Sequence, residues 1–258
     1  MYDETRHEGP AGPPRPHRTA AVIPAAGRGV RLGPGAPKAL RALGGIPMLI
    51  HAVRAMARSR AVSLVVVVAP PDGAAEVRNL LDEVSLPERT DLLVVPGGET
   101  RQESVRAGLD ALPEDVTAVL IHDAARPLVP VDTVDAVVEA VRDGAPAVVP
   151  ALPLADTVKE VEPAGRPGEP EAVLGTPERS RLRAVQTPQG FDRKTLVRAH
   201  ETIAVNGEGA TDDAGMVEKL GVTVVVVPGH EEAFKVTRPL DLVLAEAVLA
   251  RRRATDAY

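Results

Sequence analysis

Glycines and cations are concentrated just after the first apolar run of the chain, in the stretch "AVIPAAGRGVRLGPGAPKAL" at residues 21–40. Its four glycines allow a close approach of the backbone, and successive backbone N–H groups in such a turn can hold phosphate oxygens. Arg31 and Lys38 add positive charge. The stretch therefore favours phosphate binding; a plain strand-to-helix turn with solvated cations is the alternative interpretation.

Two familiar phosphate-binding motifs are excluded. A G-x-G-x-x-G fingerprint beginning at Gly27 would need glycine at position 32, which is Leu32. A Walker A loop would need the sequence G-K-[ST], which does not occur in the chain. If the stretch binds phosphate, it does so without either of these two motifs.

Small and polar residues also follow three later apolar runs, in "PGGETRQES" (96–104), "HDAARP" (122–127) and "FKVTRP" (234–239). Arg101 and Ser104 lie one helical turn apart and can share a face. Asp123 and Lys235 supply charges of opposite sign at two other ends. Because the carboxyl ends of parallel strands meet at one edge of a sheet, we expect these residues to form one rim, where binding residues collect.

The elements that must position this rim are indicated by short, Val-rich apolar runs with amphipathic segments between them. Non-alternating runs of this kind are typical of strands buried on both faces of a parallel sheet. We expect strands at 20–25, 62–69, 91–96, 118–123, 146–151 and 222–228, and helices at 46–58, 100–112, 131–142 and 239–253. The alternation predicts an α/β fold with a doubly wound, mostly parallel sheet.

The segment 152–187 departs from this alternation. "TVKEVE" and "EAVLG", separated by "PAGRPGEP", predict an antiparallel β-hairpin that projects from the sheet as an arm. Because an isolated two-stranded hairpin is marginal in water, we expect a second copy of the chain to cover it; a floppy surface loop is the alternative. We expect a disordered extension at 1–19, one domain at 20–253 that includes the arm, and a tail at 254–258.

Composition narrows the classes of function. The net charge of −6 argues against a general nucleic-acid binder, and the absence of cysteine excludes disulfides and thiolate catalysis. No apolar run approaches the ~18–20 residues of a membrane span, and the polar, Pro-rich start is not a secretory signal. We expect a cytoplasmic protein that contacts neither membrane nor nucleic acid.

Taken in chain order, "PAAGRGVRLG…PK", "GGETRQESV", "HDAARP", "TPQGF", "TDDAGM" and "FKVTRP" resemble the 2-C-methyl-D-erythritol 4-phosphate cytidylyltransferases of nonmevalonate isoprenoid biosynthesis, over about residues 20–250. The resemblance implies a Rossmann-like nucleotidyltransferase fold and the transfer of CMP from CTP to this polyol phosphate, giving 4-diphosphocytidyl-2-C-methyl-D-erythritol and pyrophosphate. It also implies Mg²⁺ as cofactor and a homodimer joined through the arm. A phosphomonoester is already a nucleophile at neutral pH, so catalysis should consist of positioning and electrostatic stabilisation.

The resemblance also implies roles for individual residues. The catalytic cations are Arg31, Lys38 and Lys235. The CTP-binding residues are Ala25, Ala26, Gly27, Gly98, Glu99, Arg101, Ser104, Asp123 and Ala124, with Asp123 as a weak metal ligand, since Mg²⁺ is held mostly by phosphates. The acceptor-binding residues are Arg126, Thr157, Arg179 and Thr187, of which Thr157 and Arg126 would come from the partner subunit. Glu99 stands where the family commonly has Asp or Asn, and Arg181 and Arg183 compete with Arg179 for its role.

Some interpretations stay open at this stage. The acceptor could instead be ribitol 5-phosphate, or the chain could be a non-catalytic nucleotide-binding protein of the same fold. His122 is interpreted as a packed strand residue rather than a catalyst. In "TDDAGM" we expect Thr211 to be a helix N-cap, with Asp212 and Asp213 in the first turn.

Overall fold

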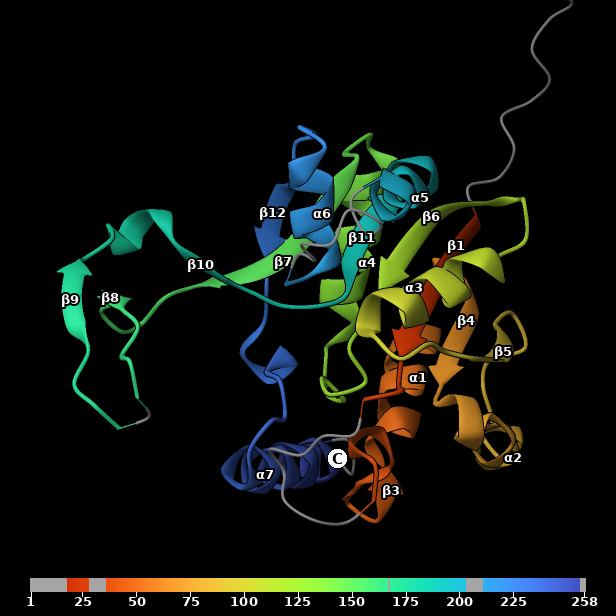
Figure 1. The fold of residues 1–258 in the computed structure, drawn as a ribbon. Coiled ribbons are helices and arrows are strands. Elements are labelled where there is room, and N and C mark those ends of the chain that lie inside the picture. The colour runs from red at the N-terminus through yellow and green to blue at the C-terminus, as the bar shows by residue number, and fades with distance from the viewer. Residues whose placement is uncertain (1–17, 28–35, 167, 203–210, 256–258) are drawn as a thin grey trace, which may run out of the picture.

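The computed structural model describes residues 18–27, 36–166, 168–202 and 211–255. An eight-stranded sheet forms its centre and helices cover both faces (Figure 1). Its strands are β1 (Arg18–Pro24), β4 (Val62–Ala69), β5 (Asp91–Pro96), β6 (Val116–Ile121), β7 (Ala147–Pro153), β10 (Arg183–Val185), β11 (Gln189–Asp192) and β12 (Val225–Pro228). The helices are α1 (Met48–Arg58), α2 (Ala74–Asp82), α3 (Arg101–Asp110), α4 (Val131–Arg142), α5 (Arg193–Thr202), α6 (Asp213–Lys219) and α7 (Pro239–Thr255).

The strand order is β10-β7-β11-β6-β1-β4-β5, and β12 also pairs with β7. β6, β1, β4 and β5 are parallel neighbours, as is the β12–β7 pair. β11 lies antiparallel between β6 and β7, and β10 pairs antiparallel with the end of β7. The prediction of a doubly wound, largely parallel α/β sheet is confirmed, with two antiparallel strands that the apolar pattern did not indicate.

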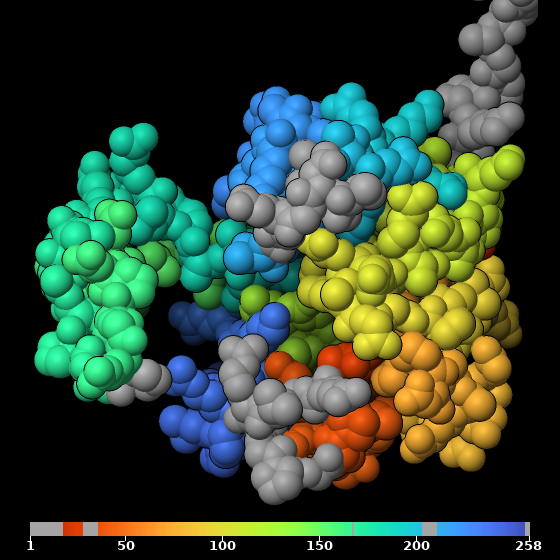
Figure 2. Space-filling model, in the orientation of Figure 1, coloured from red at the N-terminus to blue at the C-terminus, as the bar shows by residue number. Residues whose placement is uncertain are grey.

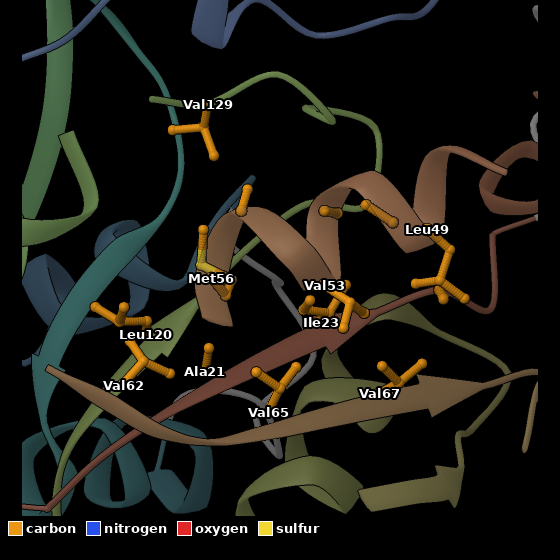
Figure 3. Close-up of a cluster of buried hydrophobic side chains, with 14 of the residues drawn as sticks. Ala21, Ile23, Leu49, Val53, Met56, Val62, Val65, Val67, Leu120 and Val129 are labelled. Atoms are coloured by element: carbon orange, nitrogen blue, oxygen red, sulfur yellow. The ribbon is translucent and has the colours of Figure 1, made fainter. Parts of the chain in front are cut away.

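The core lies in two layers, one on each face of the sheet. Ala21 and Ile23 of β1 face the layer that α1, α2 and α4 complete (Figure 3). Ala20 and Val22 face the opposite layer, which α3, α5 and α6 complete. Because both faces are covered, every position of β4 except Ser63 is buried. This explains the unbroken runs of valine in the sequence.

Most element boundaries agree with the sequence analysis, and the differences have local causes. The strand expected at 222–228 begins at Val225, because the ladder with β7 spans only Val225–Pro228. The helix expected at 46–58 begins at Met48, because Ile46 and Pro47 pair with Ala42 and Leu43 in a small hairpin of β2 (Ala42–Leu43) and β3 (Ile46–Pro47).

The two ends of the described chain extend regular structure beyond the predicted limits. β1 begins at Arg18, inside the extension expected at 1–19, and Arg18 forms ion pairs with Asp91 (2.9 Å) and Asp115 (3.2 Å). α7 continues to Thr255, inside the expected tail. The expected disorder of the preceding residues concerns a segment, 1–17, that lies outside the described residues.

Helix α3 packs unusually close to the sheet, at Gly108. A Cβ at this position would clash with Cγ1 of Val22 and would lie 3.0 Å from Cγ2 of Val68. Glycine therefore sets how closely the C-terminal part of α3 approaches β1 and β4. The helix also begins as predicted, with a capping box in which Thr100 and Glu103 bond each other's backbone N–H groups.

The predicted arm is present and projects sideways from the sheet (Figures 1 and 2). β8 (Glu160–Glu162) and β9 (Ala172–Gly175) form its antiparallel hairpin, and β10 returns the chain to β7. Val173 and Leu174 of β9 are 59% and 61% exposed, so the hairpin presents an apolar surface that nothing in the described chain covers. None of the described helices is both long enough and apolar enough to cross a bilayer.

Candidate active site

A cavity of about 270 Å³ opens at the carboxyl edge of the sheet. Its walls come from the ends of β1 and β6, the start of α3, the short 3₁₀ helix at Lys38–Leu40 and the segment before α7. The predicted residues that line it are Ala25, Ala26, Gly27, Lys38, Glu99, Arg101, Ser104, Asp123, Ala124 and Lys235. Four separate strand ends and connections thus form one rim, as the sequence analysis expected.

The remaining predicted residues lie elsewhere. Gly98 and Arg126 are next to lining residues in sequence, and Thr187 contacts Asp123, but none of the three lines the cavity. Thr157 and Arg179 are exposed on the arm. Arg179 donates a hydrogen bond to the backbone oxygen of Ala155, also on the arm. Its competitors Arg181 and Arg183 do not line the cavity either, and Arg183 donates to the carbonyls of Ser180 (2.9 Å) and Leu182 (2.8 Å).

Arg31, the first of the predicted catalytic cations, lies outside the described residues.

Asp123 is the central anion of the cavity. Its Oδ2 lies 2.6 Å from Nζ of Lys235, and its Oδ1 lies 3.7 Å from a guanidinium nitrogen of Arg101. Burial alone would raise the pKa of Asp123, but the positive charges of Lys235 and Arg101 outweigh burial and lower it to about 2. Asp123 is therefore a carboxylate at neutral pH, and it holds two cations at the mouth of the site.

Arg101 is held by the carboxylate of Asp213, which was expected in the first turn of a helix but was given no role in the site. Asp213, in the first turn of α6, is completely buried, and its Oδ2 lies 2.7 Å from Arg101. His200 of α5 contacts the other oxygen at 3.0 Å. Burial would lower the pKa of Arg101, but the charges of Asp213 and Asp123 reverse this and raise it. Arg101 thus keeps its charge while it is held between two carboxylates.

The N-cap predicted for α6 was wrong. Asp212, not Thr211, caps the helix: its Oδ1 accepts from the N–H of Gly215 at 2.9 Å, and its Oδ2 accepts from Gln189 at 2.6 Å. Asp213 is then turned inward toward Arg101. Both are capping-type residues in sequence, and only the position of β11 and α5 decides which one caps and which one supports the site.

Ser104 offers a polar group to the cavity. Its Oγ is buried and has no hydrogen-bond partner within the described parts of the chain. A buried hydroxyl without a partner costs free energy, roughly 1–3 kcal/mol, so one that faces a cavity is well placed to bond a ligand. The capping box at Thr100 fixes the first turn of α3 and thereby the direction of this hydroxyl.

His122 and Thr187 form a buried support under Asp123. Oγ1 of Thr187 accepts from the N–H of Asp123 (3.0 Å) and lies 3.1 Å from Nδ1 of His122, while Nε2 of His122 lies 3.2 Å from the carbonyl of Arg126. The carbonyl can only accept, so the neutral ring carries its proton on Nε2. Burial lowers the pKa of His122 to about 4, which agrees with the interpretation of a packed, uncharged residue.

Arg126 points away from the cavity and ties two other segments together. Its guanidinium donates to the carbonyl oxygens of Ala233 (2.6 Å) and Val185 (3.2 Å). Val236 completes the link, because its N–H donates to the carbonyl of Ala125 at 2.8 Å. The segment that carries Lys235 is therefore attached to the end of β6 on both sides of Lys235.

Comparison with known proteins places this geometry in a family. Residues 19–251 match the family described as "2-C-methyl-D-erythritol 4-phosphate cytidylyltransferase". Relatives with this description include one from Streptomyces avermitilis, 78% identical over all of both chains, and one from Streptomyces coelicolor, 81% identical over 94% of this chain and 89% of the relative.

Solved structures show the same fold. The 2-C-methyl-D-erythritol 4-phosphate cytidylyltransferase from Thermus thermophilus is 36% identical and aligns with a TM-score of 0.69 over 90% of this chain and 98% of its own. A 4-diphosphocytidyl-2C-methyl-D-erythritol synthase from Anaerococcus prevotii is 27% identical, with a TM-score of 0.77 over 91% of this chain and 99% of its own.

A basic cavity at this edge of a doubly wound sheet, in a chain with these relatives, makes the protein a nucleotidyltransferase of the cytidylyltransferase class. Over nearly its whole length the chain belongs to the 2-C-methyl-D-erythritol 4-phosphate cytidylyltransferase family. The resemblance inferred from the sequence motifs is thereby confirmed.

Proposed function

We propose that the cavity at the carboxyl edge binds CTP, and that its cations promote transfer of CMP to 2-C-methyl-D-erythritol 4-phosphate. The reaction gives 4-diphosphocytidyl-2-C-methyl-D-erythritol and pyrophosphate, a step of isoprenoid precursor biosynthesis. The observation that carries the proposal is that Lys38, Arg101 and Lys235, far apart in sequence, line one cavity. Gly27, at the start of the glycine-rich stretch, lines the same cavity.

The chemistry needs charge neutralisation more than proton transfer. A phosphate oxygen of the acceptor attacks the α-phosphorus of CTP in line, the bond to the bridging oxygen breaks, and pyrophosphate leaves with the bonding electrons. Two anions must meet, and negative charge grows on the leaving group. Lys38 and Lys235 are assigned to the phosphates, where fixed cations in a partly dry site stabilise this charge.

The nucleoside half of CTP is assigned to the other wall. Backbone groups of Ala25, Ala26 and Gly27 line the cavity beside β1, and Ser104 supplies a hydroxyl without a partner in the described chain. Arg101 shapes the same wall and cannot swing freely, because Asp213 holds it. This arrangement suits recognition of a base and ribose by short, fixed groups.

Mg²⁺ fits the donor set as a cofactor held mainly by substrate. The described residues contain no group of three side chains that could hold a metal by themselves, but the ionised Asp123 provides one oxygen donor within the cavity. Mg²⁺ commonly takes one or two carboxylates plus phosphate oxygens. When bound, it would neutralise part of the triphosphate charge, and Asp123, oriented by its ion pair with Lys235, would supply the protein's oxygen ligand.

The acceptor half of the site is proposed to need a second subunit. Thr157 and Arg179 stand on the arm and do not line the cavity of their own chain. Val173 and Leu174 give the arm an exposed apolar strand, which favours association with another chain. In a homodimer, Thr157 of the arm would complete the partner's acceptor site.

The experiment compares two acceptors. Purified protein with CTP and Mg²⁺ is given 2-C-methyl-D-erythritol 4-phosphate or ribitol 5-phosphate, and pyrophosphate release is followed. We expect rapid turnover with the first and little with the second. Turnover with ribitol 5-phosphate alone would refute the assigned acceptor, and no turnover with either would favour a non-catalytic nucleotide-binding role. The double variant Lys38→Ala/Lys235→Ala serves as the inactive control.

A further inference from the structure

A second cavity, of about 230 Å³, lies between α1, α7 and the chain that follows β6. We call it the arginine pocket, because Arg54 and Arg58 of α1 and Arg252 and Arg253 of α7 line it together with His51. No acidic side chain is among the described residues of its lining. It shares no lining residue with the nucleotide cavity, so it is a separate site.

Part of this positive charge has no role in holding the fold. In the described chain, the guanidinium groups of Arg54 and Arg58 form neither an ion pair nor a hydrogen bond. Arg58 is not needed to cap α1 either, because Arg89 already donates to the carbonyls of Ala57 (3.0 Å) and Arg58 (3.1 Å). Cations gathered without a counter-charge repel one another, and an anion between them would relieve that repulsion.

We propose that the arginine pocket binds a small phosphate dianion, either inorganic phosphate or a phosphomonoester. Guanidinium groups bond phosphate oxygens in pairs, and a pocket that offers several from two facing helices can surround one phosphate. The cavity volume is several times the share of liquid occupied by one water, about 30 Å³, which is enough room for one phosphate.

His51 would complete the phosphate shell. Its Nε2 lies 2.9 Å from the carbonyl of Leu43, which leaves Nδ1 for a ligand. Burial, followed by the charges of Arg54, Arg253 and Arg58, lowers the pKa of His51. A bound dianion would offset these charges and favour the protonated ring, which donates from both nitrogens. The ring is therefore a local reporter of occupancy.

The pocket is connected to the nucleotide cavity through Arg252. This side chain donates to Oε2 of Glu232 (2.7 Å from Nε) and to the carbonyl of Leu128 (2.6 Å). Glu232 lies three residues before Lys235, and Leu128 lies two residues after Arg126, which holds the Lys235 segment. A phosphate that competes with Glu232 for Arg252 would loosen that segment. The expected effect of phosphate on turnover rests on the proposed function, whereas the binding of phosphate to the arginine pocket does not.

The test measures phosphate binding with the nucleotide cavity already filled. The full-length protein is saturated with CTP and Mg²⁺ in the absence of acceptor, and inorganic phosphate is titrated at constant ionic strength, with calorimetry and the imidazole NMR signals as readouts. We expect saturable binding that shifts the signal of His51. Arg54→Gln/Arg58→Gln should weaken it at least tenfold, while Arg198→Gln, on the exposed side of α5, should leave it unchanged.

Two further measurements accompany this test. A second titration with glycerol 3-phosphate shows whether a phosphomonoester binds more tightly than the free ion. Circular dichroism of the double variant checks that both arginines are dispensable for folding. The proposal is overturned if phosphate does not saturate, or if the double variant binds it as well as the parent protein, in which case the arginines serve only the helix C-termini.

Discussion

At the scale of single residues, the position of Arg101 depends on the buried carboxylate of Asp213. Asp213→Asn keeps the shape but removes the charge that holds Arg101, so we expect the KM for CTP to rise about tenfold with a smaller change in kcat. Removal of one partner of a buried ion pair should also lower the free energy of unfolding by about 3 kcal/mol. Steady-state kinetics and urea unfolding measure the two effects.

Asp212→Asn is the matched control for Asp213→Asn, since Asn can also cap α6. We expect this control to change the KM for CTP less than twofold. Equal KM values for the parent protein and Asp213→Asn would remove Asp213 from the positioning of Arg101.

The lowered pKa of His122 predicts that the stability of the protein depends on pH. Its folded-state pKa of about 4 lies below the ordinary value of 6.5, so the unfolded chain binds its proton more readily. The stabilising contribution of the neutral ring is therefore complete above about pH 6.5 and is lost as the pH falls toward about 4. The shift corresponds to about 3 kcal/mol at most, because one pKa unit is worth about 1.4 kcal/mol.

The measurement compares urea unfolding of the parent protein and His122→Gln between pH 7 and pH 4. The parent protein should lose stability more steeply over this window, because Gln does not titrate. Parallel curves for the two proteins would mean that the ring of His122 is not held uncharged by the fold.

At the scale of elements, Gly108 sets the distance between α3 and the sheet. Alanine favours a helix by up to about 1 kcal/mol relative to glycine, yet we expect Gly108→Ala to destabilise the protein by about 1–3 kcal/mol through overpacking against Val22. Val22→Ala makes room, so the double variant should be more stable than the sum of the two single effects. Strict additivity in thermal unfolding would show that no clash exists.

The elements were predictable where burial alone decides them. β1 and β4 are covered on both faces, and their unbroken apolar runs predicted both strands. β11 was not predictable: it is a short segment, Gln189–Asp192, whose strand character comes from insertion between β6 and β7. The cap of α6 was missed for the same reason, because Gln189 of β11 bonds Asp212 and so decides its role. Such partners are distant in sequence.

At the scale of the whole molecule, the proposed shared site makes activity depend on assembly through the arm. Deletion of residues 158–178 removes β8 and β9, and with them the exposed Val173 and Leu174. We expect a monomer with little activity, measured by light scattering after size exclusion and by pyrophosphate release. Leu174→Asp is the milder companion variant, which keeps the hairpin but charges its apolar face. A fully active monomer from either variant would refute the shared site.

The arrangement of the whole molecule also determines which part of the site could be inferred from the sequence. That the residues predicted to bind the nucleotide lie together could be inferred from motifs at strand ends, because the parallel sheet brings those ends together whatever the details of packing. The residues predicted to bind the acceptor do not all gather at the cavity of one chain, because Thr157 and Arg179 lie on the arm, which projects from the sheet (Figure 1). The motif "HDAARP" also did not predict that the side chain of Arg126 donates to the carbonyls of Ala233 and Val185.

The account depends most on the cations at the carboxyl edge, and the single-turnover rate of pyrophosphate release tests them directly. With CTP and 2-C-methyl-D-erythritol 4-phosphate saturating, Lys38→Gln and Lys235→Gln should each slow the reaction about a hundredfold or more. Lys194→Gln, which removes an exposed lysine of α5 outside the cavity, should change the rate less than twofold. Rates for Lys38→Gln and Lys235→Gln equal to that of the parent protein would contradict the account.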